Sequence, residues 1–373
     1  MDIVIIGNGP AGNTLATKLD SEGYRIDVYS NEEVSFYSRI RLPSCLGNLD
    51  KLNSLCAKNE PSYIHHEEVA TIYRESKTIK LTSGETKHYD KLVLATGSYP
   101  IDFFKGSPLK GIYTLRTYED AAKITKDIES PVCVIGGGLL GLEVSLEINS
   151  LGYDVTVIQG DTYVLNKQLN EEAAKLVSDK CLERKNYNLI CSQFVKEVKG
   201  ENRIKAVTLQ DGREIACNTL ILAAGVRPSI SLAASCNLEI NRAIIVNEFC
   251  QTSDKDIYAI GDCAEFNGKC PGLLPIALSM ANVVYNHILG KKVPYTEPVQ
   301  MPTRFQADDL PVASFGILEG TCYSKQVEDR YEAWYIKDNK VMGVIIVGSK
   351  SHIPLAKASL NKEIENIDVL LDF

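Results

Sequence analysis

Several patterns are missing from this sequence, and each missing pattern excludes a class of protein. The 11 cysteines are an odd number, and no two of them have the C-x-x-C spacing, which argues against a metal site, a thioredoxin-type dithiol and a disulfide framework. No apolar run approaches the ~18 residues that a membrane-spanning helix needs. The first expected strand begins directly after Met1 and Asp2, so we expect no cleavable signal. These absences lead us to expect a cytoplasmic protein.

Positive charge is also scarce. The chain has 40 Lys and Arg residues against 48 Asp and Glu residues, which gives a net charge of −8, and no block of basic residues stands out. A nucleic acid is therefore not expected as the main partner. Apolar residues, in contrast, make up 45% of the 373 residues, which is enough for substantial cores in two or three domains.

Two glycine motifs with the spacing G-x-G-x-x-G each follow a short apolar run, at residues 3–6 and 132–135. The glycines are Gly7, Gly9 and Gly12 in the first motif and Gly136, Gly138 and Gly141 in the second. In dinucleotide-binding folds, one glycine makes a tight turn, one lets the backbone approach a pyrophosphate, and one lets the helix pack on the strand. The pyrophosphate then lies at a helix N-terminus, where unpaired N–H groups face it. Two such motifs predict two bound dinucleotides and electron transfer between them.

The glycine motifs belong to a longer internal repeat. Each copy contains a turn glycine, Gly84 or Gly212, followed by an apolar strand that ends in an Ala-x-Gly triplet. The triplets are Ala95-Thr96-Gly97 and Ala223-Ala224-Gly225. Each copy therefore predicts a βαβ unit, then a β-hairpin, then a strand with a tight turn at its end.

A third signature follows the second copy, where the apolar residues 257–260 lead into Gly261-Asp262 and a helix opens at 271–277. Here the sequence resembles the flavoprotein reductases with two dinucleotide-binding domains, the group that includes glutathione reductase. The resemblance implies that the first motif binds FAD, that the second binds NAD(P)H, and that Asp262 bonds the ribityl chain of FAD. The implied fold is α/β, with two Rossmann-like domains and a small α+β domain at the C-terminus.

The resemblance assigns site residues to both cofactors. The residues expected to bind FAD are Gly7, Gly9, Pro10, Ala11, Gly12, Ser30, Glu32, Arg39, Ala95, Thr96, Gly97, Gly261 and Asp262. The residues expected to bind the nicotinamide nucleotide are Gly136, Gly138, Leu139, Leu140, Gly141, Glu143, Gln159, Ala224 and Gly225. A catalytic role is expected for Glu143 near the nicotinamide, and for Arg39 and Arg41 against the charge of the phosphates or the reduced flavin.

The residue after the second strand of each copy is expected to lie near an adenosine ribose, that of FAD in the first copy and that of the nicotinamide coenzyme in the second. Relatives often carry an acid at the positions of Ser30 and Gln159, where it takes ribose hydroxyls. Glu32 lies near Ser30, and Asp161 adds negative charge beside Gln159. A 2′-phosphate would be repelled by Asp161, so we expect NADH in preference to NADPH.

Further residues narrow the subfamily. Disulfide reductases of this group carry a C-x-x-x-x-C pair, but Cys45 has no partner before Cys56. Related oxidases carry a single cysteine at the position that Arg39 occupies here. Five stretches resemble NADH:rubredoxin oxidoreductases. They also resemble the flavoprotein part of the large subunit of nitrite reductase. These stretches are 37–42, 89–92, 95–98, 138–143 and 264–268.

This resemblance implies electron transfer from NADH through FAD to a small one-electron carrier, with rubredoxin favoured. Two alternatives stay open. One is an NADH oxidase, a peroxidase or a coenzyme A disulfide reductase that uses Cys45, and the other is a flavin-binding, redox-sensing interaction protein.

The predicted domains are an FAD-binding domain of residues 1–105 and 229–297, an NAD(P)H-binding domain of 106–228, and a small domain of 298–373. In the small domain we expect a β-hairpin around Asp338-Asn339, with Trp334 in the core, and a helix at 355–364. Because this domain is short, we expect a monomer or a weak homodimer.

Overall fold

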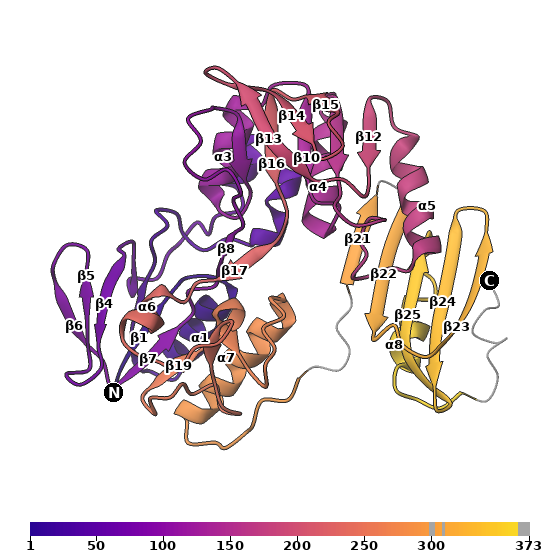
Figure 1. Ribbon diagram of the computed structural model, residues 1–373. Coiled ribbons are helices and arrows are strands. Elements are labelled where there is room, and N and C mark those ends of the chain that lie inside the picture. The colour runs from indigo at the N-terminus through magenta and orange to yellow at the C-terminus, as the bar shows by residue number, and fades with distance from the viewer. Residues whose placement is uncertain (298–302, 308–309, 365–373) are drawn as a thin grey trace. The chain divides into compact units, whose positions relative to one another are not determined.

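The computed structural model describes residues 1–297, 303–307 and 310–364 (Figure 1). The chain divides into two compact units. The first unit is Met1–Arg39, Asn53–Tyr99 and Val226–Pro298, and the second is Ile40–Leu52, Pro100–Gly225 and Val299–Phe373. The predicted α/β class with two Rossmann-like sheets is confirmed. The division into three domains stays a prediction.

A parallel sheet of strand order β19-β7-β1-β2-β3 forms the centre of the first unit. Its strands are β1 (Asp2–Ile6), β2 (Arg25–Tyr29), β3 (Ile64–His65), β7 (Lys91–Leu94) and β19 (Ile257–Ala259). The central strands are continuous apolar runs because both faces of a parallel sheet are covered. The helices α1 (Pro10–Ser21) and α7 (Leu274–Ile288) pack side by side.

The second unit repeats this arrangement with the order β12-β11-β10-β16-β9, again parallel. Its strands are β9 (Ile112–Thr114), β10 (Val132–Ile135), β11 (Val155–Ile158), β12 (Tyr187–Ile190) and β16 (Thr219–Leu222). Its helices are α3 (Tyr118–Asp127), α4 (Leu139–Ser150) and α5 (Glu171–Leu182). Each glycine motif therefore joins the central strand of its sheet to a helix, as the repeat predicts.

Both copies also contain the predicted hairpin as part of a three-stranded antiparallel sheet. The strands are β4 (Val69–Tyr73), β5 (Thr78–Leu81) and β6 (Thr86–His88) in one copy and β13 (Val195–Gly200), β14 (Ile204–Leu209) and β15 (Glu214–Ala216) in the other. The turn glycines Gly84 and Gly212 have φ of +95° and +89°. This left-handed conformation costs glycine little.

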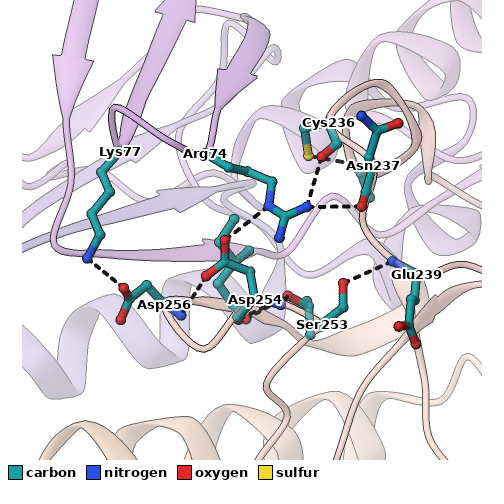
Figure 2. Close-up of polar contacts among 11 residues, drawn as sticks. Arg74, Lys77, Cys236, Asn237, Glu239, Ser253, Asp254 and Asp256 are labelled. Atoms are coloured by element: carbon teal, nitrogen blue, oxygen red, sulfur yellow. Dashed lines mark hydrogen bonds and ion pairs between the residues drawn. The ribbon is translucent and has the colours of Figure 1, made fainter.

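A network of charged side chains fastens the β4–β5 hairpin to a distant part of the first unit (Figure 2). The Arg74 guanidinium donates to Asp254 Oδ2 at 3.0 Å and to the carbonyl oxygens of Cys236 and Asn237 at 3.3 and 3.0 Å. Lys77 forms an ion pair with Asp256 at 2.5 Å. Because their partners are charged, the hydrogen bonds of Arg74 and Lys77 to the two aspartates are stronger than neutral ones, and they connect the hairpin to residues far away in the sequence.

The C-terminal region forms an antiparallel sheet of order β21-β22-β25-β24-β23. The strands are β21 (Thr303–Ala307), β22 (Leu310–Gly316), β23 (Thr321–Val327), β24 (Arg330–Lys337) and β25 (Lys340–Val347). The predicted hairpin is confirmed, since Asp338 and Asn339 have φ of +50° and +58° at its turn, and Trp334 is fully buried. The helix expected at 355–364 is wrong in its bounds. α8 (Ile353–Ser359) begins earlier, at a first turn that contains Pro354, and it ends where Leu360 turns to an extended backbone.

The remaining elements are short. They are α2 (Leu49–Asn53), α6 (Ser231–Ser235), β8 (Ser98–Pro100), β17 (Val226–Pro228), β18 (Ile244–Ile245) and β20 (Ala264–Glu265), with 3₁₀ turns at Arg39–Arg41, Pro43–Cys45 and Gly261–Cys263. Among the described residues, no helix has both the length and the apolar character to cross a lipid bilayer.

Candidate nucleotide-binding sites

The first and third glycines of the first motif are required by packing. Gly7 has φ of +113°, and a Cβ there would lie 2.2 Å from the Ala95 carbonyl oxygen. A Cβ on Gly12 would lie 2.0 Å from the Gly7 carbonyl oxygen. Both positions therefore allow the loop, the following helix and the Ala95 turn to approach closely.

The second motif has the same construction. Gly136 has φ of +109°, and its Cβ would lie 2.6 Å from the Ala223 carbonyl oxygen. A Cβ on Gly141 would lie 1.8 Å from the Gly136 carbonyl oxygen. Packing within the protein thus explains these two glycines as well.

The middle glycines behave differently. A Cβ on Gly9 or on Gly138 would meet no atom within 4 Å. Their φ values of −74° and −80° suit any residue. No contact with the described residues requires glycine at these two positions, whereas a ligand that lies against the backbone does require it. The residues present therefore fit the close approach of a pyrophosphate in both copies.

The helix ends beside these glycines also fit an anion. Neither α1 nor α4 has a side-chain cap or an acidic residue in its first turn. In contrast, α3 and α5 are capped by Thr117 and Asn170, and both have acids in the first turn. The uncapped N–H groups and the positive end of the helix dipole at α1 and α4 are free to bind phosphate oxygens.

A small cavity, open to solvent, lies beside the first glycine loop. It is lined by Asn8, Gly9, Ser30, Glu32, Val34, Ser35, Phe36, Tyr37 and Arg39. Four residues predicted to bind FAD are in this lining: Gly9, Ser30, Glu32 and Arg39. The structure therefore brings together residues of the glycine loop, the end of β2 and the loop that follows it.

Hydrogen bonds order the side chains of this cavity. Glu32 accepts hydrogen bonds from Tyr37 and Arg39, and Arg39 Nη1 donates to the Tyr37 hydroxyl at 3.0 Å. The Ser30 hydroxyl accepts from the Glu32 N–H at 3.3 Å. The sequence did not predict that the Tyr37 hydroxyl would bond both Glu32 and Arg39. The carboxylate can accept from ribose hydroxyls, and the guanidinium can donate to phosphate oxygens.

Asp262 lies near the same helix end. The preceding Gly261 would place a Cβ 3.5 Å from the Ala11 Cβ and 3.7 Å from the Ala277 Cβ, so the Gly-Asp turn lies against the N-terminal turns of α1 and α7. Ser98 Oγ donates to Asp262 Oδ2 at 2.8 Å. Sequence reasoning missed Ser98, although it directly follows the predicted triplet 95–97. Within that triplet, the Thr96 hydroxyl bonds the Ser229 carbonyl oxygen at 2.8 Å.

The end of β11 has its own polar arrangement. The Gln159 side chain is buried, and its Oε1 accepts from the Gly137 N–H at 2.8 Å. Its Nε2 donates to Asp161 Oδ2 and to the Tyr163 carbonyl oxygen, each at 3.3 Å. The carboxamide thus bonds the glycine loop itself. Direct contact of Gln159, Ala224 or Gly225 with a nucleotide stays a prediction.

Glu143 is the most perturbed acid near either glycine motif. It follows the first turn of α4, and burial raises the pKa of its carboxyl to about 7. Among the described residues it has neither a hydrogen bond nor an ion pair through its side chain. Such a carboxyl can hold or release a proton near neutral pH.

Arg41 and Cys45 both lie outside the lining of the cavity beside Gly9. Arg41 is exposed. Cys45 has no exposed surface, and the Ser44 hydroxyl lies 4.0 Å from its sulfur. Catalytic roles for Glu143, Arg39 and Arg41 stay predictions.

Comparison with known proteins identifies the family. The model of the pyridine nucleotide-disulphide oxidoreductases matches residues 1–281. The chain belongs to this family. Membership supports FAD and NADH as its cofactors, and the two glycine loops with open middle positions suit both.

Individual members of the pyridine nucleotide-disulphide oxidoreductase family are similar over nearly the whole chain. The assimilatory nitrate reductase electron transfer subunit of Bacillus subtilis is 31% identical over 93% of this chain, but the chain spans 47% of that protein. The NADH-rubredoxin oxidoreductase of Clostridium acetobutylicum is 29% identical over 99% of this chain and 97% of its own length. The crystal structure of the NADH:rubredoxin oxidoreductase from that organism has a TM-score of 0.81 at 27% identity, covering 98% of this chain and 97% of that one.

Proposed function

We propose that this protein is an NADH-dependent flavoprotein reductase that passes electrons through FAD to a small one-electron carrier, with rubredoxin as the favoured carrier. The observation that carries this proposal is that each copy of the repeat has a middle glycine, Gly9 or Gly138, whose Cβ would point into open space. Two dinucleotides in one chain suit the transfer of reducing equivalents from one to the other.

Each unit contributes its own residues. In the first unit, the α1 N-terminus would hold the FAD pyrophosphate, Glu32 would accept from the adenosine ribose, and Asp262 would bond the ribityl chain. In the second unit, the α4 N-terminus would hold the pyrophosphate of NADH. When bound, FAD supplies the ability to accept a hydride and to release electrons singly. The Glu143 carboxyl, with its pKa near 7, would hold a proton and a hydrogen bond at the nicotinamide end.

Two observations favour rubredoxin as the electron acceptor: the name of a similar protein, and the lack of a reactive pair of cysteines. The Clostridium relative, which this chain spans almost completely, is named for rubredoxin. The burial of Cys45 and the missing C-x-x-x-x-C pair leave no dithiol beside the flavin, so direct exit of electrons to a carrier is the simplest route. We further propose a cytoplasmic monomer or weak homodimer with no nucleic-acid partner.

Steady-state kinetics of the purified FAD-loaded protein test the proposal. NADH oxidation would be measured with rubredoxin, ferredoxin, oxygen, hydrogen peroxide and coenzyme A disulfide as acceptors, for the wild type and for Cys45→Ser. We expect the highest kcat/KM with rubredoxin and most of that activity in the variant, because the thiol serves packing.

Other outcomes decide between the alternatives. A peroxide, oxygen or disulfide activity that collapses in Cys45→Ser would establish a thiol enzyme, since its nucleophile would be gone. Slow reoxidation of the flavin with every acceptor, together with an NADH-dependent change in association state, would favour a redox-sensing interaction protein.

A further inference from the structure

A histidine outside the cavity lining is bonded to the loop that forms most of that lining. Residues 30–39, here called the cavity loop, supply most of the residues that line the cavity in the first unit. His66, the first residue after β3, lies against this loop. Its Nδ1 lies 2.6 Å from the Glu32 carbonyl oxygen, and its Nε2 lies 2.6 Å from Glu60 Oε2. The imidazole therefore joins the cavity loop to the segment that precedes β3.

Both partners of the His66 ring are hydrogen-bond acceptors. A carbonyl oxygen has no hydrogen to donate, so Nδ1 must donate to Glu32, and an ionised carboxylate only accepts, so Nε2 must donate to Glu60. A neutral imidazole carries a hydrogen on one nitrogen, whereas the imidazolium carries one on each. If the Glu60 carboxyl supplied the second hydrogen, the pair would hold the same number of protons. Both bonds therefore form together only while the pair of His66 and Glu60 holds one proton more than a neutral ring beside an ionised carboxylate.

The same two neighbours hold the cavity loop through its backbone. The Ser30 N–H donates to the His65 carbonyl oxygen at 2.9 Å, at the end of β3. The Ala57 N–H, in the segment before β3, donates to the Phe36 carbonyl oxygen at 3.0 Å. These backbone bonds do not titrate. His66 adds a contact of a different kind, because its bonds to the loop and to the preceding segment depend on a proton.

The surroundings of His66 favour its charged form. The hydrogen bond to the Glu32 carbonyl raises the pKa of the imidazole above its ordinary value, burial opposes this rise, and the carboxylates of Glu60 and Glu33 add to it. The Glu32 carboxylate is itself paired with Arg39. The side chains of His66 and Glu60 are 30% and 25% exposed, so they can exchange protons with water. The ring is therefore charged below this raised pKa and loses its extra proton as pH rises through it.

We propose that His66 and Glu60 form a proton-dependent clamp that holds the cavity loop in the conformation that binds FAD. When the extra proton leaves to the solvent, one ring nitrogen presents a lone pair to an acceptor oxygen, and the bond to Glu32 or to Glu60 is lost. The loop then gains conformational freedom that FAD binding must remove, so FAD binds more weakly at high pH. His66 is a positioning residue, since its bonds are made to the protein. This inference rests on the proposed function, because it takes the cavity to be part of an FAD site.

Release of FAD from the loaded, full-length protein tests the clamp without turnover. The FAD dissociation constant would be measured from dilution series, by the fluorescence of released flavin, at pH values on both sides of the His66 pKa. For the wild type we expect this constant to rise about tenfold as the ring loses its proton, as for a lost hydrogen bond to a charged group. His66→Gln should give a constant that no longer varies with pH, because a carboxamide donates without titrating.

Two further variants and two further readouts separate the clamp from a general loss of structure. Glu60→Gln should move the midpoint of the pH profile to lower pH, because it removes a charge that favours the imidazolium. The control His88→Gln, which removes an exposed histidine of β6 in the same unit, should keep the wild-type profile. In the protein with or without FAD, the NMR titration of the His66 ring should give the midpoint directly. Amide hydrogen exchange of the cavity loop, corrected for its intrinsic pH dependence, should accelerate above that midpoint.

The inference is overturned if the FAD dissociation constant of the wild type does not change across the His66 titration, or if His66→Gln keeps the wild-type pH profile. It is also overturned if Glu60→Gln leaves the midpoint where it is. A wild-type protein that takes up no FAD at any pH would instead refute the proposed function of the first site. In that case the NMR and exchange measurements, which need no FAD, would still decide whether His66 holds the cavity loop.

Discussion

A matched pair of substitutions in the second glycine motif separates the glycine that packing requires from the glycine that a ligand requires. At Gly141, an alanine Cβ would lie 1.8 Å from the Gly136 carbonyl oxygen and 3.4 Å from the Ala223 Cβ. The backbone must move by more than 1 Å to restore ordinary contact, and such overpacking costs about 1–3 kcal/mol. Alanine in a helix recovers about 0.5–1 kcal/mol of this cost.

At Gly138 the same change meets open space. Its φ of −80° and ψ of −174° suit alanine, which gains about 0.4–1 kcal/mol through the unfolded chain. Alanine is a poorer N-cap than glycine, which offsets that gain. We therefore expect Gly138→Ala to leave the thermal midpoint almost unchanged and to weaken NADH binding at least about tenfold, because its methyl group displaces the pyrophosphate.

Differential scanning fluorimetry of both variants, with NADH binding followed by nucleotide fluorescence, checks this pair. The second motif is chosen because NADH, unlike FAD, can be left out of the melting experiment. Gly141→Ala should lower the midpoint by about 2–4 °C for each kcal/mol lost. Equal destabilisation by the two variants, or wild-type NADH affinity in Gly138→Ala, would refute the reasoning.

Three further predictions concern other parts of the sites. Asp262→Ala, which removes the partner of Ser98, should give purified protein with little FAD by its absorbance spectrum, and full loading would contradict the assigned role. Burial raises the pKa of Glu143 to about 7, so the folded state loses stability as pH rises from the ordinary glutamate pKa to about 7; Glu143→Gln should remove that loss, about 2–3 kcal/mol in denaturant titrations at pH 8 against pH 5. Rubredoxin turnover should slow as salt rises, because an acidic carrier must be steered by a local basic patch on this acidic protein; salt-independent stopped-flow rates would oppose this.

The sequence predicts the backbone of both glycine sites because local chemistry decides it there. The turns after the two central strands need a residue with positive φ, which Gly7 and Gly136 supply. The apolar runs before these glycines are typical of strands that are buried in the centre of a sheet. The turns at the two Ala-x-Gly triplets can be predicted for the same reason, because each comes directly after a buried strand and its glycine has positive φ. A sequence pattern also shows the hairpin at Asp338-Asn339, where two residues adopt positive φ.

Side-chain networks and exposed strands could not be predicted in this way. The bonds of Glu32 to Tyr37 and Arg39 depend on the path of an irregular loop, which no periodicity reveals. β23 (Thr321–Val327) is mostly exposed, so it lacks the apolar alternation by which a strand is recognised. The Gln159 bond to Gly137 joins two loops of one unit that only the folded sheet brings together.

The sheet of the first unit has a consequence for synthesis of the chain. Its edge strand β19 pairs with β7, and the Asp256 carbonyl oxygen accepts from the Leu92 N–H at 2.9 Å. On the ribosome, β1, β2 and β7 emerge early but wait for residues 257–259 before their sheet is complete. The sheet of the second unit, from β9 to β16, is complete once residue 222 has emerged. The later copy of the repeat can therefore fold while the sheet of the first unit still lacks its edge strand. An FAD site that includes Asp262 has to wait for this last strand.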